Sequence, residues 1–166
     1  MSFDWDTLAD RLRTYPSGYH QFLAPCPHHR IIAVEEEIGP MPVVLRQMLE
    51  HFNGAKLFIA TGPMLRVFGL STVPPLAPME WGVDWYIDKF TPKWRESGPN
   101  RSGDWAIGMT NYGGLLLFSE SRGIKEWDTG ESRWLFADMP FDDWIEKVIK
   151  DGEVMMAELK LDRPQG

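Results

Sequence analysis

Three short apolar segments in the second half of the chain, separated by tight-turn sequences, constrain its fold more than any other feature. They cover residues 104–109, 114–119 and 124–127. The breaks between them, Asn111-Tyr112-Gly113 and Ser121-Arg122-Gly123, contain residue types that let the backbone reverse within a few positions. Strands joined by such short connections pair in opposite directions. The pattern therefore predicts an antiparallel meander.

A helix is predicted directly after this region, over residues 141–152, with one more short strand before it at 134–137. Acidic residues stand near the start of this helix and lysines near its end, as the helix dipole favours. Gly152 is expected to end it. The apolar stripe that would face the core consists of Phe141, Trp144, Ile145, Val148 and Ile149.

Apolar spacing earlier in the chain favours helices, with two short strands between them. Asp4 is a suitable N-cap for the first helix, Pro42 is a suitable first residue for the third, and Asn53-Gly54 is expected to end the third. The predicted helices cover 5–12, 31–38, 42–52 and 83–94, the predicted strands cover 56–60 and 65–68, and loops are expected at 16–27, 72–79 and 95–103.

These elements predict one domain, residues 1–166, of the α+β class. We expect a central, mostly antiparallel sheet with helices packed against it. A chain of 166 residues, 43% of them hydrophobic, is long enough to bury one sizeable core.

The charge balance disfavours several kinds of partner. The chain has 17 Lys and Arg against 24 Asp and Glu, which gives a net charge of -7. A negative field repels phosphate groups and anionic lipids, so neither nucleic acid nor a membrane is an expected partner. A basic protein would be attracted.

Cysteine usage and the N-terminus bear on the compartment. The single cysteine, Cys26, excludes an intramolecular disulfide and suits a reducing compartment. Residues 1–6 are acidic where a signal peptide is basic, and no apolar segment approaches the roughly 20 residues needed to cross a bilayer. We expect a cytoplasmic protein.

The densest group of reactive side chains is His20, Cys26, His28 and His29. These are residue types that bind zinc, but their spacing matches no common zinc pattern, and adjacent side chains diverge. Cys26 could instead be a nucleophile activated by a nearby histidine, yet it lies between two prolines and not on a rigid element. We expect exposed imidazoles and an inert thiol, with no metal, no cofactor and no catalytic residue.

Two other groups invite a functional interpretation. Glu126 and Asp128 lie two positions apart on a predicted strand, so they share a face and could form an acid–base pair. We favour the interpretation that both lie on the solvent-exposed face of the meander while Trp127 packs inward. Trp81, Trp85 and Trp94 could line an aromatic groove, but core packing is favoured because Trp usually buries most of its area.

The run Glu35-Glu36-Glu37-Ile38-Gly39-Pro40-Met41-Pro42, followed by a helix that closes on Asn53-Gly54, resembles the opening of the SUKH superfamily, which includes the Smi/Knr cell-wall assembly regulators. Three later segments are similar to the family's strand region: Trp105-Ala106-Ile107-Gly108, Tyr112-Gly113-Gly114 and Gly123-Ile124-Lys125-Glu126-Trp127-Asp128. The resemblance extends over about residues 35–152. Met41 stands where the family usually has leucine, which is a volume-conserving change.

The resemblance implies an α+β fold with a central sheet and no enzymatic activity. Many bacterial proteins of this kind are immunity proteins, which bind and neutralise a secreted toxin, often a nuclease, and others are regulators or scaffolds. Partner surfaces vary within the family, so no site residue is carried over by motif.

We therefore expect a non-enzymatic protein-binding domain, and specifically an immunity protein that neutralises a basic toxin domain. The alternatives are a regulatory or scaffold protein with an endogenous protein partner, and a small metal or thiol enzyme that uses Cys26 and the nearby histidines. The expected partner-binding surface lies at the edge of the meander, with Trp127 or Trp81 as an anchor. Its acidic residues are Glu120, Glu126, Asp128 and Glu131.

Overall fold

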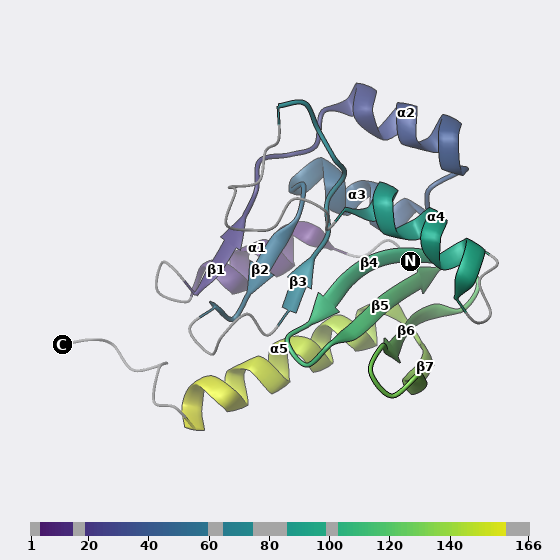
Figure 1. The fold of residues 1–166 in the computed structure, drawn as a ribbon. Helices are drawn as coiled ribbons and strands as arrows, with labels where there is room; N and C mark the ends of the chain where they lie inside the picture. Colours follow the sequence, from purple (N-terminus) through teal and green to yellow (C-terminus); the bar gives the residue numbers. More distant parts are fainter. Residues whose placement is uncertain (1–3, 15–18, 60–64, 75–85, 99–102, 159–166) are drawn as a thin grey trace.

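The strands of the protein form one antiparallel sheet in the order in which they occur in the chain (Figure 1). The structure is a computed structural model, and it describes residues 4–14, 19–59, 65–74, 86–98 and 103–158. Each neighbouring pair among the seven described strands is antiparallel. The strands are β1 (His20–Phe22), β2 (Ala55–Leu57), β3 (Leu65–Val67), β4 (Trp105–Thr110), β5 (Gly114–Ser119), β6 (Gly123–Asp128) and β7 (Arg133–Met139).

Five described helices accompany this sheet, and the predicted α+β class with a mostly antiparallel sheet is confirmed. In the view of Figure 1, α5 runs below β4 and β5, while α2 and α4 lie above them. The N-cap prediction for Asp4 is also confirmed, because its carboxylate accepts the backbone N–H of Thr7 at 3.0 Å. The helices are α1 (Trp5–Arg13), α2 (His28–Ile38), α3 (Val43–His51), α4 (Ile87–Ser97) and α5 (Phe141–Glu158).

The meander of β4, β5 and β6 has the predicted order and turns. β5 begins and ends at the predicted residues, and all six of its residues are buried. It pairs with β6 without a break in register, from Gly114 opposite Asp128 to Ser119 opposite Gly123. A strand that is buried throughout reads as a continuous apolar run, which is why Leu115–Phe118 marks it clearly in the sequence.

The first half of the chain departs from the predictions at two places. β1 lies inside the predicted loop 16–27, because a three-residue strand with two exposed residues has no recognisable alternation. α2 begins at His28 and not at residue 31, since Pro27 already occupies the N-cap and the three polar residues after it carry no apolar period. The predicted helix start at Val83 lies outside the described residues.

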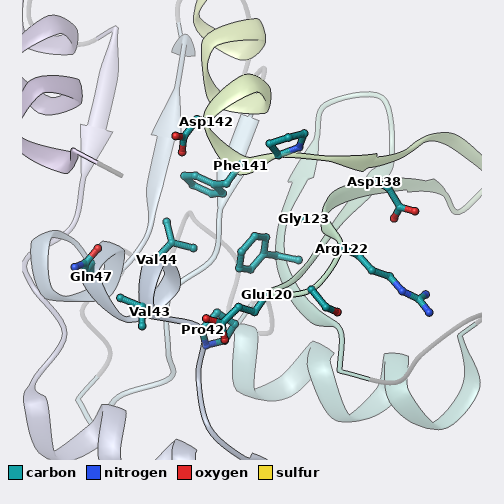
Figure 2. A pocket seen from close by; sticks show the side chains of 13 residues that line it. Pro42, Val43, Val44, Gln47, Glu120, Arg122, Gly123, Asp138, Phe141 and Asp142 are labelled. Atoms are coloured by element: carbon teal, nitrogen blue, oxygen red, sulfur yellow. The ribbon is translucent and has the colours of Figure 1, made fainter. Parts of the chain in front are cut away.

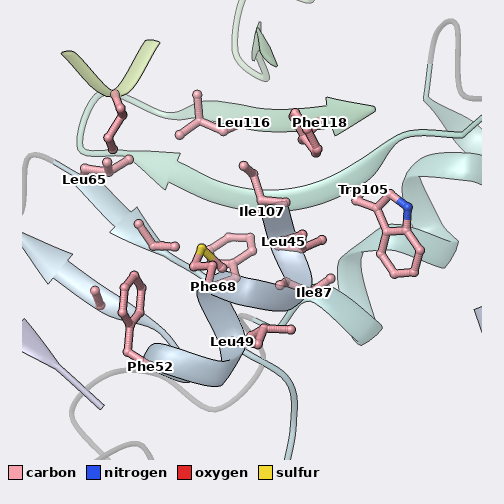
Figure 3. Packing of buried hydrophobic residues seen from close by; sticks show 14 of the residues in the cluster. Leu45, Leu49, Phe52, Leu65, Phe68, Ile87, Trp105, Ile107, Leu116 and Phe118 are labelled. Carbon is pink, nitrogen blue, oxygen red and sulfur yellow. The ribbon is translucent and has the colours of Figure 1, made fainter. Parts of the chain in front are cut away.

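The hydrophobic core lies where α3 and α4 meet the central strands (Figure 3). Leu49 of α3 and Ile87 of α4 are fully buried, and Phe68 is 1% exposed. Full burial of an aliphatic or aromatic side chain of this size stabilises a fold by about 1.5–3 kcal/mol. The buried face of α3 consists of Leu45, Met48 and Leu49.

The prediction that Gly152 ends the last helix is wrong. α5 continues through Gly152 to Glu158, and Gly152 is buried within it. A Cβ atom at this position would lie 2.4 Å from the Phe58 ring. Gly152 is therefore glycine because the ring of Phe58 packs directly against the helix backbone.

This contact predicts an inverted response to a helix-favouring substitution. Gly→Ala in a helix interior usually stabilises by about 1 kcal/mol. Gly152→Ala is instead expected to lower the free energy of unfolding by about 1–3 kcal/mol, because the added methyl group overpacks the contact with Phe58. Chemical denaturation measures the change.

The Phe58→Ala background supplies the control. In the protein that lacks the Phe58 ring, Gly152→Ala should lower the free energy of unfolding much less. The effects of the two substitutions should therefore be strongly non-additive. If the Gly152→Ala single variant were more stable than the parent, the Phe58 ring would not be in close contact with the helix backbone in solution.

Candidate partner-binding cleft

An open cleft of about 730 Å³ lies between the start of α3, the β5–β6 turn and the start of α5 (Figure 2). We call it the α3–α5 cleft. Its apolar surface comes from Pro42, Val43, Val44, Phe118, Pro140 and Phe141. Its polar surface comes from Gln47, Glu120, Ser121, Arg122, Asp138 and Asp142, with Gly123 between them.

Two prolines that immediately precede helices shape the walls. Pro42 is the N-cap of α3, and its carbonyl accepts the N–H of Arg46 at 3.0 Å. Pro140 precedes α5, and its carbonyl accepts the N–H of Trp144 at 3.0 Å. A proline has no N–H of its own to satisfy at such a position. Each wall is therefore a fixed helix start, and Val43 on the first turn of α3 remains 57% exposed.

The connection that leads into α3 is held by Glu35 of α2. Its carboxylate accepts the backbone N–H of Met41 at 3.1 Å and forms an ion pair with Arg46. The first residue of the Glu35–Glu37 acidic run thus ties α2 to α3 and fixes the chain just before Pro42. Glu35 therefore sets the position of this wall of the cleft.

The third wall depends on a glycine in the β5–β6 turn. Gly123 has a φ of 84°, which glycine adopts without strain. A Cβ atom there would lie 2.3 Å from the carbonyl oxygen of Met139. The absence of a side chain lets the start of β6 approach the end of β7, which brings Asp138 to the rim.

The rim of the cleft is predominantly acidic. Glu120, Asp138 and Asp142 supply three exposed carboxylates, and Arg122 supplies one guanidinium. Because the floor is apolar and the rim negative, the cleft has the chemistry to accept a cationic segment with an apolar face.

The structure separates the residues predicted for the partner surface. Glu120 lines the α3–α5 cleft. Asp128 and Glu131 lie near the opposite end of the β5–β6 hairpin, where the Asp128 carboxylate accepts the backbone N–H groups of Gly130 and Glu131 at 2.9 and 3.0 Å. Trp81 lies outside the described residues.

The prediction that Glu126 lies on the solvent-exposed face of the meander is wrong. Its side chain is only 3% exposed, because α5 covers this face of the sheet and places Trp144, Lys147 and Val148 beside it. Burial raises the pKa of Glu126, against the opposing effects of the Tyr112 hydroxyl and the Lys147 ammonium. Desolvation at its hydroxyl, together with the neighbouring Glu126, also raises the pKa of Tyr112 to about 12, although the residue as a whole is 65% exposed. Glu126 is thus unavailable as part of an exposed acidic patch.

Trp127 and Trp94 pack inward, as the sequence analysis favoured. Trp94 is 7% exposed, and Trp127 lies partly buried against the core. Their rings meet in an edge contact at 6.1 Å between centroids, and Trp127 makes a closer one with Trp134 at 4.8 Å. These rings serve packing, so Trp127 is not an exposed anchor.

Sequence reasoning missed a buried ion pair beside these rings. Lys125 is 2% exposed, and its Nζ lies 2.8 Å from the Asp104 carboxylate, which also accepts the indole N–H of Trp94 at 3.0 Å. The Lys125 ammonium further stands 5.1 Å from the ring centroid of Trp134. A buried charge needs such pairing, since its desolvation is costly. The signal in the sequence is a charged residue inside the strand pattern, directly after buried Ile124.

The histidine and cysteine residues are not brought together. His20 lies on β1, where its Nδ1 accepts the backbone N–H of Phe58 at 3.1 Å. His28 and His29 are exposed on the first turn of α2. In the part of the chain that the structure describes, no three His, Cys, Asp or Glu side chains gather in a way that could hold a metal ion.

Cys26 is buried between β1 and α2, and its backbone N–H binds the carbonyl of Leu49 at 2.8 Å. Burial raises the pKa of its thiol to about 11. The thiol is therefore protonated near neutral pH, and a protonated thiol is a poor nucleophile. Cys26 acts here as a small apolar side chain.

Comparison with known protein families finds no model that matches this chain, and comparison with curated protein sequences finds no match. None of the described helices has the length and apolar character needed to cross a membrane.

His20 predicts a measurable pH dependence of stability. Burial lowers its pKa from the ordinary 6.5 to about 4. Between these values the unfolded chain binds a proton that the folded chain does not, so the free energy of unfolding should fall as the pH falls through this window. NMR titration should place the His20 midpoint near 4, and His20→Gln should remove this part of the pH slope.

His28→Gln is the matched control, since His28 is exposed and its replacement should leave the slope unchanged. A His20 midpoint at its ordinary value would contradict the buried position of this ring.

Proposed function

We propose that the protein is a non-enzymatic protein-binding domain whose α3–α5 cleft takes a basic segment of a partner protein. The observation that carries this proposal is the combination of an apolar floor with three exposed carboxylates at the rim. The net charge of -7 acts in the same direction, because it attracts a cationic partner at long range.

The two parts of the cleft contribute differently to binding. Burying Val43 and its apolar neighbours would supply affinity, because an exposed valine loses contact with water when a partner covers it. The rim carboxylates would orient the partner and raise the association rate more than they strengthen the final complex. Affinity is therefore expected to depend on the floor, and its salt dependence on the rim.

A binding role fits the chemistry of the cleft better than catalysis does. Among the described residues, His20, Cys26 and Tyr112 have strongly shifted pKa values, and none of them lines the cleft. Active sites commonly hold titratable groups with perturbed pKa values, and the α3–α5 cleft holds none of these three. The thiol-enzyme alternative built on Cys26 also gains no support from a thiol held buried and protonated.

The narrower proposal is an immunity protein that neutralises a basic toxin domain. Its support is the resemblance of the segment from Glu35 to Gly54, and of the meander, to the SUKH superfamily. In the structure this segment forms the α2–α3 connection and α3, so it supplies one wall of the α3–α5 cleft. A toxin domain that binds nucleic acid would present the basic surface that this cleft suits.

The floor of the cleft predicts the effect of Val43→Ser. The partner is first captured from a native lysate at low salt and identified by mass spectrometry, and its affinity is then measured. Val43→Ser should weaken the affinity about 5- to 30-fold, because a central apolar contact is lost while serine remains suitable at a helix start.

Val154→Ser is the matched control, since Val154 is 52% exposed on α5 and lies outside the cleft. The proposal fails if both serine variants bind the partner as the parent does.

The rim predicts a separate effect on kinetics. Glu120→Lys should lower the association rate constant several-fold at low salt, and the difference from the parent should shrink as salt screens the charge. Stopped-flow or surface-binding kinetics at two salt concentrations measures it. Glu36→Lys makes the same charge change at an exposed position of α2. An equal reduction of the association rate constant in this variant would indicate an effect of net charge and not of the rim of the cleft.

A further inference from the structure

A second, smaller cavity of about 50 Å³ lies against α5, at the end of the β5–β6 hairpin opposite to the α3–α5 cleft. Its polar lining consists of Thr110, Tyr112, Glu126, Lys147 and Asp151. The space is enough for a few water molecules or for the end of one small polar group. We call it the Glu126 cavity.

The carboxylate of Glu126 is the unusual member of this lining. The residue is 3% exposed, and its Oε1 accepts the hydroxyl of Tyr112 at 3.3 Å. Its Oε2 is buried and accepts no hydrogen bond of normal geometry among the described residues, although the nearby Thr110 hydroxyl acts to lower the pKa of Glu126. A buried carboxylate oxygen that lacks a donor is costly, so the cavity presents an acceptor that a ligand could satisfy.

A glycine in the neighbouring strand leaves the space that this carboxylate occupies. A Cβ atom on Gly114 would lie 2.0 Å from Oε2 of Glu126. Any residue other than glycine at this position would displace the carboxylate from the cavity. The position of Oε2 is thus fixed by the β4–β5 turn as well as by the rotamer of Glu126.

The charges around the cavity leave one negative charge unmatched. Lys147 and Asp151 form an ion pair on α5 with 2.6 Å between Nζ and Oδ2, so their charges balance. Ionised Glu126 then has no cation of its own at hydrogen-bond distance among the described residues. A ligand with a single positive charge would make the cavity neutral.

The apolar part of the lining limits the shape of such a ligand. Phe136 and Trp144 contribute aromatic walls, and Leu65, Leu116 and Val148 contribute aliphatic ones. A short alkyl chain that ends in a compact donor group can lie along these side chains. A planar guanidinium needs more width than an ammonium group and satisfies its donors less well in so small a space.

We propose that the Glu126 cavity binds a primary ammonium group, carried either by a small free amine or by a lysine side chain. The ammonium donates to Oε2 of Glu126 and to the hydroxyls of Thr110 and Tyr112. The attached methylene groups contact Phe136 and Trp144. This inference concerns a site distinct from the α3–α5 cleft and does not depend on the proposed partner.

The test uses n-butylammonium as the probe and the full chain as the protein, followed by NMR shifts of the Trp144 indole N–H. Saturable binding with a dissociation constant in the millimolar range is expected for a ligand of about five non-hydrogen atoms. n-Butanol has the same chain without the charge and should bind at least about tenfold more weakly, because it cannot form a charge-assisted hydrogen bond with Glu126.

Glu126→Gln keeps the shape of the side chain and removes its charge, so it should weaken butylammonium binding at least about tenfold. Glu120→Gln is the matched control, because Glu120 is exposed in the α3–α5 cleft. This variant should bind butylammonium as tightly as the parent protein does. Unsaturable shifts, or equal binding by the parent and Glu126→Gln, would overturn the proposal and leave a cavity that holds water only.

Lys147→Gln provides a second arm that does not touch the core, because the Lys147 side chain is 56% exposed. It removes a like charge at the cavity and should tighten butylammonium binding, whereas weaker binding would overturn the proposal. Nα-acetyl-lysine N-methylamide then distinguishes the two sources of the ammonium. Binding as tight as that of butylammonium indicates a lysine side chain, and binding of butylammonium alone indicates a free amine.

Discussion

β5 is buried along its whole length, and this burial fixes the positions of the strands beside it. Each of its six residues is buried, and β4 and β6 flank it in antiparallel register. A one-residue slip of this strand would move every side chain to the opposite face of the sheet, where the packing neighbours are different. The two ends of the β5–β6 hairpin are therefore fixed points, and one of the two candidate sites lies at each end.

Charged residues inside the fold follow from the same enclosure. Lys125 and Glu126 are neighbours on β6, and both are almost fully buried. Lys125 is matched by Asp104 and by the ring of Trp134, whereas Glu126 has the Tyr112 hydroxyl at one oxygen and a small cavity at the other. Lys125 has an ion-pair partner within the protein, whereas Glu126 has none among the described residues and one of its oxygens borders a cavity. This difference separates an interior structural ion pair from a candidate ligand site.

Helix starts and close backbone contacts position the larger cleft. Pro42 and Pro140 immediately precede two helices whose first turns line the cleft, and Gly123 lets the start of β6 approach the end of β7 at the third wall. At the far end of α5, Gly152 makes room for the ring of Phe58, whose backbone N–H in turn binds His20 of β1. α5 thus connects the cleft with the opposite edge of the sheet through packing.

The α+β class, the antiparallel meander and the buried stripe of α5 could be predicted from the amino-acid sequence, because apolar periodicity and turn residues act over a few neighbouring positions. The inward packing of Trp94 and Trp127 was also predicted. Of the residues predicted for a partner surface, Glu120 lies at a cleft. The tertiary structure alone decided the burial of Glu126, the pairing of Lys125 with Asp104 and the packing role of Gly152. Each of these depends on a contact between residues far apart in the chain. A charged residue inside a strand pattern marks Lys125 locally, but no local pattern identifies its partner, the helix that covers Glu126 or the ring that packs on Gly152.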